Sequence, residues 1–410
     1  MKQWIKNILI WCMTVVARLV IARKSPKVIV VIGSVGKTST KNAIYTMIGT
    51  TMHVLKSSDT ASSNLSALYA LLGVATGNNR TKDMFHALMS GLDSLVFGGD
   101  YPEYIVLELS AKKKGTIKKI SKWLRPYIVV MTRFPDIPAH VEYFKNAQEL
   151  IEEKTSIARS LRKDGALILN ADDVNVLAQK DILKSKTFTY GFTDGATIHG
   201  SNLQVLAPTL ESSGGITFKA NFDEKSFPVM LNNIYSEEYA GIALASLAVG
   251  YALEINMVDA IARLLEYVTP EGRARLHFLS SGVTIIDDSY DSSPIACESA
   301  LKMLERIPFG KRKIAVLGDM LGLGRFTVSA HEHIGKLSYE YADILVTCGL
   351  RAKKIADGAR TTRMSQKKIF ETETVDEAKE IVKKNAKAGD VILIKGAHSM
   401  HLGKITDALK

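Results

Sequence analysis

Cysteine is scarce in this chain, and the few cysteines present are scattered. The 410 residues include three, Cys12, Cys297 and Cys348. Their separation excludes a disulfide framework of the kind that stabilises small secreted domains, and no C-x-x-C pair provides the spacing of a zinc site. The cysteine pattern therefore favours a reducing compartment, such as the cytoplasm, and gives no support to a zinc site.

Compact clusters of arginine, or of alternating basic and aromatic residues, are also absent, although the formal net charge is +11. Without such a cluster the charge gives no indication of nucleic-acid binding, and it fits anionic substrates or an anionic membrane surface instead. The chain has no internal repeats and no low-complexity tract. Its 46% hydrophobic and 23% charged residues are typical of a globular protein, and 410 residues predict two or three domains.

A long uninterrupted hydrophobic run is missing as well. The apolar stretch over residues 8–17 ends at Arg18, ten residues are too few to span a bilayer, and no cleavage motif of a secretory signal follows. Two interpretations of residues 1–25 stay open: a helix packed on the protein itself, or an interfacial helix with Trp4 and Trp11 among lipid headgroups. The interfacial helix would place these basic side chains on anionic lipid: Lys2, Lys6, Arg18, Arg23, Lys24 and Lys27.

Apolar runs alternate with helical segments from residue 26 onward. Such alternation is typical of a parallel sheet with helices on both faces. Residues 186–231 differ, because short alternating runs with Gly and Ser pairs predict a β-rich insertion or sheet edge, and an apolar-faced helix follows at about 237–252. The predicted buried strands are Val28–Ile32, Tyr104–Leu109, Tyr127–Thr132, Ala166–Leu169, Val283–Ile286, Lys313–Leu317, Ile344–Thr347 and Val391–Ile394.

The segment TPEGRAR, residues 269–275, has the composition of a linker between domains. We therefore expect the fold class α/β with three parts. These are an apolar and basic N-terminal helix over residues 1–25, a first α/β domain with a parallel sheet over residues 26–268, and a second α/β domain over residues 269–410.

The stretch VIVVIGSVGKTSTKNAI, residues 28–44, combines a buried strand, a glycine turn and a helix start. The usual G-x-x-x-x-G-K-[ST] pattern expects glycine where this chain has Val31. The physical elements of an anion site are nevertheless present, because backbone N–H groups and the positive helix end converge on one point. A chance glycine turn with a solvated lysine is the less favoured alternative. The candidate nucleotide-binding residues are Gly33, Ser34, Gly36, Lys37, Thr38 and Ser39.

Three further residues are candidates for chemistry. Glu108 ends the apolar strand YIVLELS, and an acid at the carboxyl end of a parallel strand can reach a Mg²⁺ held by phosphates. A capping carboxylate would look the same. His140 lies just beyond a predicted strand, and Lys154 follows on a helix among acids. Taken alone, each would be read as a surface residue.

The order of these motifs resembles that of the Mur ligases. G-x-x-G-K-T, the strand-end Glu, A-H, E-K and then LILNADD at 167–173 occur in sequence. In the second half, GRARLHFLSSGVTIIDDSYDSSP (272–294), KIAVLGDMLGLG (313–324) followed by His331, and GDVILIKGAHS (389–399) look like the MurF type of this family. That type reads D-D-S-Y-N-A-N-P, V-L-G-D-M-x-E-L-G and K-G-S-R at these places. The resemblance covers roughly residues 26–410, and G-x-x-G-K-[ST] is the family's own form of the phosphate loop.

The resemblance implies a Mur-type central ATP-binding domain and a dinucleotide-fold-like C-terminal domain. It also implies a reaction in which ATP phosphorylates a substrate carboxylate and an amine, such as that of D-Ala-D-Ala, attacks the acyl phosphate. An amide, ADP and phosphate result, in the synthesis of a peptidoglycan precursor of the cell wall. Positioning and charge neutralisation dominate such chemistry, so the implied cofactors are ATP and Mg²⁺.

Roles for single residues follow from the same resemblance. Lys37 and Thr38 would hold phosphates and one Mg²⁺, Glu108 would be a Mg²⁺ ligand, and His140 would lie at a second metal. Lys154 matches a lysine that family members carry as a carbamate, which makes it an anionic metal ligand.

The remaining implied contacts are with the nucleotide. Arg273 would reach the phosphates from the C-terminal domain, Asp288 the ribose, and Tyr290 would lie near the adenine. Asn64 matches an asparagine of the loop that faces the γ-phosphate. The expected catalytic residues are Lys37, Glu108, His140, Lys154 and Arg273, and the expected metal ligands are Thr38, Glu108, His140 and Lys154.

Several positions depart from the family pattern, all of them outside the phosphate and metal positions. The resemblance therefore implies an active ligase with altered nucleotide or acceptor contacts. The departures are Arg133 in T-N-I, Ser156 in K-x-E, Asp291 and Ser293 in place of two asparagines, Gly322 in E-L-G, and Ala397-His398 in K-G-S-R.

Family members also begin with a domain of about a hundred residues that binds the UDP-sugar substrate, whereas some 25 residues precede the phosphate loop here. Either another protein supplies that surface, or the substrate carries no UDP-muramoyl head. We expect a small-molecule or cell-wall-precursor substrate, no nucleic acid, and a cytoplasmic protein that contacts the inner face of the membrane through residues 1–25. The sequence gives no indication of the oligomeric state.

Other functions stay open at this point. A related ligase could act on another polymer or a lipid-linked substrate, although the motifs DDSY and VLGDM and the lack of zinc-site cysteines argue against poly-γ-glutamate and amidotransferase-coupled enzymes. A plain P-loop ATPase would leave the C-terminal motifs unexplained. A membrane-tethered scaffold that binds ATP without turnover is the alternative outside the enzymes.

Overall fold

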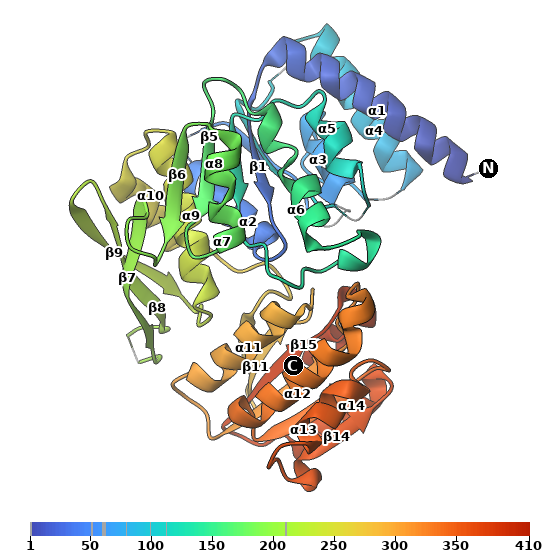
Figure 1. Cartoon of the computed structure of the whole chain (residues 1–410), viewed down its shortest axis with the longest axis vertical. Helices are drawn as coiled ribbons and strands as arrows, with labels where there is room; N and C mark the ends of the chain where they lie inside the picture. The colour runs from blue at the N-terminus through green and yellow to red at the C-terminus, as the bar shows by residue number, and fades with distance from the viewer. Residues whose placement is uncertain are drawn as a thin grey trace.

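The computed structural model describes residues 2–50, 52–59, 63–78, 80–98, 100–111, 113–209 and 211–410. Two sheets organise these residues, one in the first part of the chain and one in the last (Figure 1). The predicted α/β fold class is confirmed.

The larger sheet has nine strands in the order β2-β3-β1-β4-β5-β6-β7-β8-β9. Strands β1 to β6 are parallel to their neighbours, β6 and β7 also pair parallel, and β7, β8 and β9 pair antiparallel. The bounds are β1 Lys27–Ile32, β2 Val54–Lys56, β3 Tyr104–Glu108, β4 Ile128–Met131, β5 Ala166–Asn170, β6 Thr187–Gly191, β7 Ile198–Leu206, β8 Gly215–Phe222 and β9 Lys225–Asn232.

The unbroken apolar run of β1 has a simple cause, since both faces of the strand are buried. Ile29 and Val31 belong to the core on one face, whereas Val28, Val30 and Ile32 belong to the core on the other. Side chains alternate across a strand, so a central parallel strand needs apolar residues at every position. The first core includes residues of α2 and α9, and the second includes residues of α1, α3 and α4.

The predicted β-rich region at 186–231 forms one edge of this sheet, from β6 to β9, in which β6 is still parallel to its neighbours and β7, β8 and β9 pair antiparallel. The helices of this part of the chain are α1 Lys2–Lys24, α2 Lys37–Ile48, α3 Ser63–Leu71, α4 Thr81–Val96, α5 Thr116–Ser121, α6 Ala147–Thr155, α7 Val174–Leu177, α8 Gln179–Leu183, α9 Glu238–Ala252 and α10 Met257–Leu264.

The smaller sheet has six strands in the order β10-β11-β15-β12-β13-β14, parallel except for β10. Its strands are β10 Arg275–Phe278, β11 Thr284–Asp288, β12 Arg312–Gly318, β13 Ile344–Cys348, β14 Ile369–Thr372 and β15 Asp390–Lys395. Its helices are α11 Pro294–Arg306, α12 Thr327–Tyr341, α13 Lys353–Arg360, α14 Val375–Asn385 and α15 Gly403–Leu409.

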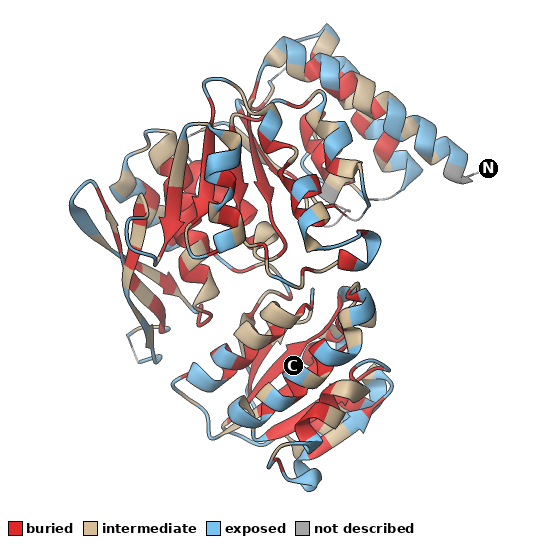
Figure 2. Cartoon of the chain, viewed as in Figure 1, coloured by how far each residue is buried: buried red, intermediate tan, exposed pale blue. Residues whose placement is uncertain are grey.

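The N-terminal helix α1 lies at the end of the molecule furthest from the smaller sheet (Figure 1). It is longer than the ten-residue run counted in the sequence, because apolar residues continue the helix on both sides of that run and beyond Arg18. By length and composition, residues 4–24 are sufficient to cross a membrane, so the expectation that the segment is too short was wrong. One side of α1 is nevertheless buried against the protein (Figure 2), where Met13, Ala17 and Val20 are fully covered.

Candidate active site

The phosphate loop connects β1 to α2, as predicted, and its shape requires two glycines. Gly33 has φ 149°, and a Cβ there would lie 1.9 Å from the Thr132 hydroxyl, so no larger residue is tolerated. Gly36 has φ 81° and caps the N-terminus of α2 in the left-handed conformation. The helix start therefore points its unpaired N–H groups at the turn.

The two residues directly after β4 hold the loop in place from the side. The Ser34 amide donates a hydrogen bond of 2.8 Å to the Arg133 carbonyl, and the Thr132 hydroxyl donates one of 2.6 Å to the Val35 carbonyl. These contacts pre-form the loop, so the entropy of ordering it is not lost when an anion binds.

Lys37, Thr38 and Glu108 meet at the carboxyl edge of the sheet. Lys37 Nζ donates to the Ser34 carbonyl over 3.3 Å, and the Thr38 hydroxyl donates to Glu108 Oε2 over 2.7 Å. The sequence-based expectation for Glu108 agrees with the register, because β3 lies beside β1 and pairs Glu108 with Val31. A hydroxyl and a carboxylate at this spacing are hard oxygen ligands of the kind that Mg²⁺ prefers.

Lys154 reaches the same loop from α6. Its Nζ donates a hydrogen bond of 2.7 Å to the Ser34 hydroxyl and lies 5.9 Å from the centre of the Phe134 ring. The residue is only 4% exposed. Burial, and then the neighbouring charge of Lys37, lower the pKa of Lys154 well below its usual range. The side chain that the resemblance singled out is therefore a buried amine beside the phosphate loop, not a surface lysine.

His140 and Asn64 lie at the rim of this region. His140 begins a short 3₁₀ turn with φ 69°, and its backbone comes so close to Gly322 that a Cβ on that glycine would be 3.0 Å from the His140 nitrogen. The side chain of Asn64 pairs with the backbone of Ser110, donating to the carbonyl over 3.1 Å and accepting from the amide over 3.3 Å. Asn64 thus anchors the loop that follows β3.

Arg273 enters the site from the start of the C-terminal part of the chain. Its guanidinium carbon lies 4.4 Å from the centre of the Tyr290 ring, and Nη1 lies 3.9 Å from Asp291 Oδ2. Burial by itself lowers the pKa of Arg273, but the charges of Asp291 and Glu108 outweigh it and the pKa is raised. Within the described residues, Nε of Arg273 is buried without a hydrogen-bond partner, and Arg273 lines a cavity next to the phosphate loop.

Hydroxyl groups connect Arg273 to α2, the helix that follows the phosphate loop. Tyr239 donates to the Arg273 carbonyl over 2.8 Å and lies 3.2 Å from the Ser39 hydroxyl. Tyr267 donates to the Ser39 carbonyl over 3.2 Å. This chain of contacts fixes the position of the arginine relative to α2.

Asp288 ends β11 and is paired with a buried lysine. Lys395 Nζ donates to Asp288 Oδ2 over 2.6 Å, and the Ala274 amide donates to Oδ1 over 3.2 Å. Burial raises the pKa of Asp288 in spite of Lys395. The carboxylate faces the turn that carries Arg273, at the edge where ligands bind in open α/β sheets.

Most of the predicted residues line one cavity of about 360 Å³ between the two sheets. A second cavity of about 410 Å³ lies on the other side of the loop, and a narrow space of about 60 Å³ beside Asp288 and Lys395 separates the two. Gly33 and Asn64 do not line these cavities. The predicted residues of the first cavity are Ser34, Lys37, Thr38, Glu108, His140, Lys154, Arg273 and Tyr290.

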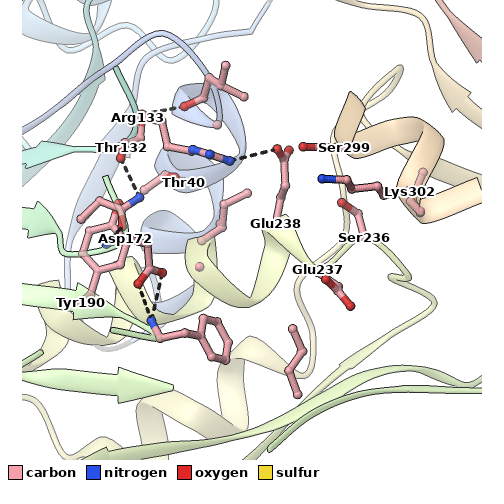
Figure 3. Close-up of a pocket in the computed structure, with 18 of the residues that line it drawn as sticks. Thr40, Thr132, Arg133, Asp172, Tyr190, Ser236, Glu237, Glu238, Ser299 and Lys302 are labelled. Atoms are coloured by element: carbon pink, nitrogen blue, oxygen red, sulfur yellow. Dashed lines mark hydrogen bonds and ion pairs between the residues drawn. The ribbon is translucent and has the colours of Figure 1, made fainter. Parts of the chain in front are cut away.

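The second cavity contains the arginine that replaces the family's asparagine. Figure 3 shows Arg133 pointing toward Glu238 of α9, with Nη1 3.7 Å from Oε1, and Ser299 and Lys302 of α11 beside them. Burial raises the pKa of Glu238. Tyr290 does not line this cavity but the first one, together with Glu108 and His140.

No group of three or more His, Cys, Asp and Glu side chains suited to a metal ion occurs among the described residues. A metal held by protein ligands alone is therefore not supported there. Thr38 and Glu108 fit an ion that takes its other ligands from phosphates and water.

Comparisons with known proteins match both halves of the chain to one family. Residues 31–229 match the family described as Mur ligase middle domain, and residues 272–398 match Mur ligase, glutamate ligase domain. The chain belongs to the Mur ligases. It is an ATP-dependent, ADP-forming ligase, so the predicted family and enzyme class are confirmed.

Individual relatives agree with this assignment. The UDP-N-acetylmuramoyl-tripeptide–D-alanyl-D-alanine ligase of Bacillus subtilis is 29% identical over 385 residues, which cover 93% of this Mur ligase and 76% of the relative. MurF from Acinetobacter baumannii has the same fold with a TM-score of 0.78 at 20% identity, covering 97% of this chain and 80% of that one. MurF of Thermotoga maritima in complex with ADP has a TM-score of 0.76 at 21% identity, covering 98% and 83%.

Some residues of the ligase site were not predicted as site residues. Glu238 and Tyr239 begin the long apolar helix α9. Two consecutive acids at a helix start are explained by favourable interaction with the helix dipole, so they do not indicate a site. Lys395 had a usable signal, because a lysine that ends a fully buried parallel strand is rare without a partner. Arg133, Asp291 and His398 were noticed only as departures from the family pattern.

Proposed function

We propose that this ligase carries out the MurF-type reaction, in which a peptide carboxylate is activated by ATP and joined to D-Ala-D-Ala. The observation that carries the proposal is the cavity of about 360 Å³ in which Lys37, Thr38 and Glu108 face Arg273 from the other part of the chain. The carboxylate attacks the γ-phosphate, ADP leaves, the dipeptide amine displaces phosphate from the acyl phosphate, and a proton is released. Little acid–base chemistry is needed, so positive charge and positioning supply most of the catalysis.

We assign the cations of the cavity to the phosphates. Lys37 is positioned by the Ser34 carbonyl and would contact the β- and γ-phosphates. Arg273 lines the same cavity, and a transferring phosphoryl group would accept hydrogen bonds from its guanidinium. Because Arg273 comes from the C-terminal part, the arrangement of the two parts would control when the phosphate is activated.

Mg²⁺ would be held by Thr38 and Glu108 together with the phosphates, and His140 lies on the same cavity for a second ion. When bound, Mg²⁺ would neutralise charge that develops on the phosphate oxygens. The protein's own contribution is the geometry, since Glu108 holds the Thr38 hydroxyl at 2.7 Å and keeps both oxygens on one side of the loop.

We propose that Lys154 is a carbamate in the active enzyme. The buried amine has a lowered pKa, so it is available in the neutral form that reacts with CO₂, giving a carbamate and a proton. The product would be an anion beside the ammonium group of Lys37, and both side chains lie at Ser34.

The nucleotide base would occupy the cavity of about 410 Å³ beside Gly36, with the ribose near Asp288. In this arrangement the phosphates would lie across the phosphate loop, between the base in one cavity and the reacting carboxylate in the other. The domain boundary would fall near residues 268 and 269, because α10 ends at Leu264 and β10 begins at Arg275.

We further propose that the enzyme works in the cytoplasm at the inner face of the membrane, with residues 1–25 in contact with lipid. Two exposed tryptophans on α1 support this contact, since tryptophan is favoured at the membrane interface.

The function is tested by phosphate release and product mass. Purified protein is incubated with Mg·ATP, UDP-N-acetylmuramoyl-tripeptide and D-Ala-D-Ala, and each substrate is left out in turn. We expect phosphate release only with both substrates, and a product heavier than the tripeptide precursor by the dipeptide minus water. Phosphate release without either substrate would indicate a plain ATPase, and nucleotide binding without any turnover would indicate a scaffold.

A further inference from the structure

Exposed apolar side chains are concentrated at one end of this molecule. Among the described residues 22 large hydrophobic side chains are exposed, and eleven of them lie on α1, on α4 or at Phe97 directly after α4. Soluble monomers rarely gather exposed apolar residues in this way unless the surface has a partner.

Helix α1 carries apolar residues on two sides. Met13, Ala17 and Val20 face the core and are fully buried. Trp4 and Trp11 are each 68% exposed, and with Ile8, Val15, Arg18 and Ala22 they repeat at intervals of four and three residues. This spacing places them along one side of the helix, away from the buried side.

Helix α4 lies along α1 and adds a second apolar stripe. The two helices are in contact, because a Cβ on Gly91 would be 2.9 Å from Val16 and Lys24 Nζ donates to the Gly98 carbonyl over 3.0 Å. The stripe on α4 has the spacing of one helix face and consists of Phe85, Met89, Leu92 and Val96, all exposed.

Positive charge accompanies these stripes. The first acidic residue of the chain is Asp59, so α1 has no acid at all. The guanidinium of Arg18 lies 5.4 Å from the centre of the Trp123 ring, which places the segment around α5 beside α1. That segment also lacks acids, and its exposed basic residues are Lys113, Lys114, Lys118, Lys119, Lys122 and Arg125.

The buried side of α1 argues against a membrane-spanning helix. Met13, Ala17 and Val20 belong to the same core as residues of α3 and α4. A membrane-spanning arrangement of α1 would require these three side chains to leave that core. The helix can keep its core contacts and still present Trp4 and Trp11 to lipid if it lies in the plane of the interface.

We propose that α1, α4 and the segment 113–125 form one docking surface for an anionic lipid bilayer, with α1 lying parallel to the membrane plane. The inference extends the contact proposed for residues 1–25 to two further elements. Apolar side chains of both helices would enter the headgroup region, and the lysines around α5 would contact anionic lipid. The smaller sheet lies at the opposite end of the molecule and would face the cytoplasm (Figure 1).

Sedimentation with lipid vesicles tests the docking surface. The full-length protein is mixed with vesicles of phosphatidylcholine alone or with one-third phosphatidylglycerol, at low and high salt. We expect binding to the anionic vesicles, at least tenfold weaker binding to neutral ones, and weakening by salt. Fluorescence of Trp4 and Trp11 is expected to shift to shorter wavelength on binding, measured in a Trp123→Phe background.

Variants outside α1 distinguish the three-element docking surface from a membrane contact that is limited to residues 1–25. Lys118→Gln/Lys119→Gln/Lys122→Gln and Phe85→Gln/Met89→Gln should each weaken binding at least tenfold. The matched controls are Lys367→Gln/Lys368→Gln/Lys384→Gln in the C-terminal part and Ile182→Gln/Val258→Gln, all exposed sites, which should bind normally. Circular dichroism confirms that each variant is folded.

Each other outcome overturns a defined part of the account. If only Trp4→Ser/Trp11→Ser abolishes binding, the contact is limited to α1 and the three-element surface is wrong. If the intact protein binds none of the vesicles, the proposed membrane contact of residues 1–25 is wrong as well. If it instead sediments as a dimer that Phe85→Gln/Met89→Gln dissociates, the surface binds a second copy and not lipid.

Discussion

At the scale of single residues, the site brings two lysines to one serine. Lys37 donates to the Ser34 carbonyl and Lys154 to the Ser34 hydroxyl. Two ammonium groups this close are unfavourable in a buried place, so the arrangement suits a bound polyanion or a lysine that is not positively charged. The next three predictions depend on this feature.

Replacing Lys37 by alanine should remove one charge that stabilises the transferring phosphate. We expect turnover to fall by a hundredfold or more, on the order of 3 kcal/mol of transition-state stabilisation. Steady-state phosphate release measures the effect, with Lys145→Ala, an exposed lysine near α6, as the control. Near-normal turnover in Lys37→Ala would refute the assignment of the phosphate loop.

Lys154→Ala should be nearly inactive, because it removes the proposed anionic ligand. Short carboxylates such as acetate or formate should restore part of the activity by occupying the space of the carbamate. Turnover is measured as a function of carboxylate concentration. The control is Lys37→Ala, whose activity carboxylates should not restore. A high-resolution map of an active Mg·ATP complex with an unmodified Lys154 amine would contradict the prediction.

Lys154 also makes stability depend on pH. Its pKa is lowered in the folded state, so between that value and the ordinary value near 10.5 the unfolded chain binds more protons and stability rises with pH. In bicarbonate-free buffer, Lys154→Leu should therefore raise the Tm by a few degrees at pH 7, with a smaller gain at pH 10. Thermal unfolding at the two pH values measures this, and an equal gain at both, or the same gain in Lys145→Leu, would argue against a buried amine.

The positions of single residues in the site were predictable from sequence only where a motif marks them. Lys37, Thr38 and Glu108 follow from the strand–turn–helix pattern and from parallel strands that end at one edge. Lys395 at the end of a buried strand signals a partner, but neither its partner Asp288 nor Ser39, the partner of Tyr239, could be predicted, because each pair is more than 100 positions apart. Packing over such separations has no local signature.

At the scale of elements, buried strands were the most predictable part of the fold. The continuous apolar runs of β1, β3, β4 and β5 agree with their observed bounds within one or two residues, because both faces of each strand are covered. Strands β2 and β14 were not predicted, since they are short and not fully buried. Helix α1 is longer than the predicted apolar stretch because Arg18 is exposed on the side of the helix and does not interrupt it.

The packing of α1 gives a prediction at this scale. Ala17 is fully buried on the inner side of α1, whereas Ala22 on the same helix is exposed. Ala17→Asp should destabilise the first part of the protein by roughly 3 kcal/mol or more, because it buries an unpaired charge. Urea unfolding followed by circular dichroism compares it with Ala22→Asp, which should be nearly neutral. Equal stability of the two variants would show that α1 does not pack as described.

At the scale of the whole molecule, the two sheets share one site. The loop, Glu108 and Lys154 come from the first part of the chain, and Arg273, Asp288 and Tyr290 come from the second. Neither part holds all the groups that we assign to the reaction, so we expect activity to require both in contact. Sequence motifs predicted these site residues, but only the three-dimensional structure shows that most of them line one cavity.

Because Arg273 comes from the second part of the chain, we expect the rate of phosphoryl transfer to depend on how the two parts are arranged. Arg273→Lys keeps the positive charge but loses the forked N–H geometry and the contact with Tyr290. We expect kcat to fall about tenfold to a hundredfold with little change in nucleotide affinity, as seen by comparing turnover with ADP titration. A loss confined to nucleotide affinity would place Arg273 in binding and not in phosphoryl transfer.

The central claim is that this site activates a carboxylate by phosphorylation. It is tested most directly by labelling the terminal carboxylate of the UDP-N-acetylmuramoyl-tripeptide with ¹⁸O and analysing the phosphate released with Mg·ATP and D-Ala-D-Ala by mass spectrometry. Because amide formation through an acyl phosphate transfers one carboxylate oxygen to phosphate, the account predicts one ¹⁸O in each phosphate released. Unlabelled phosphate would mean that water attacks ATP, and would contradict the account.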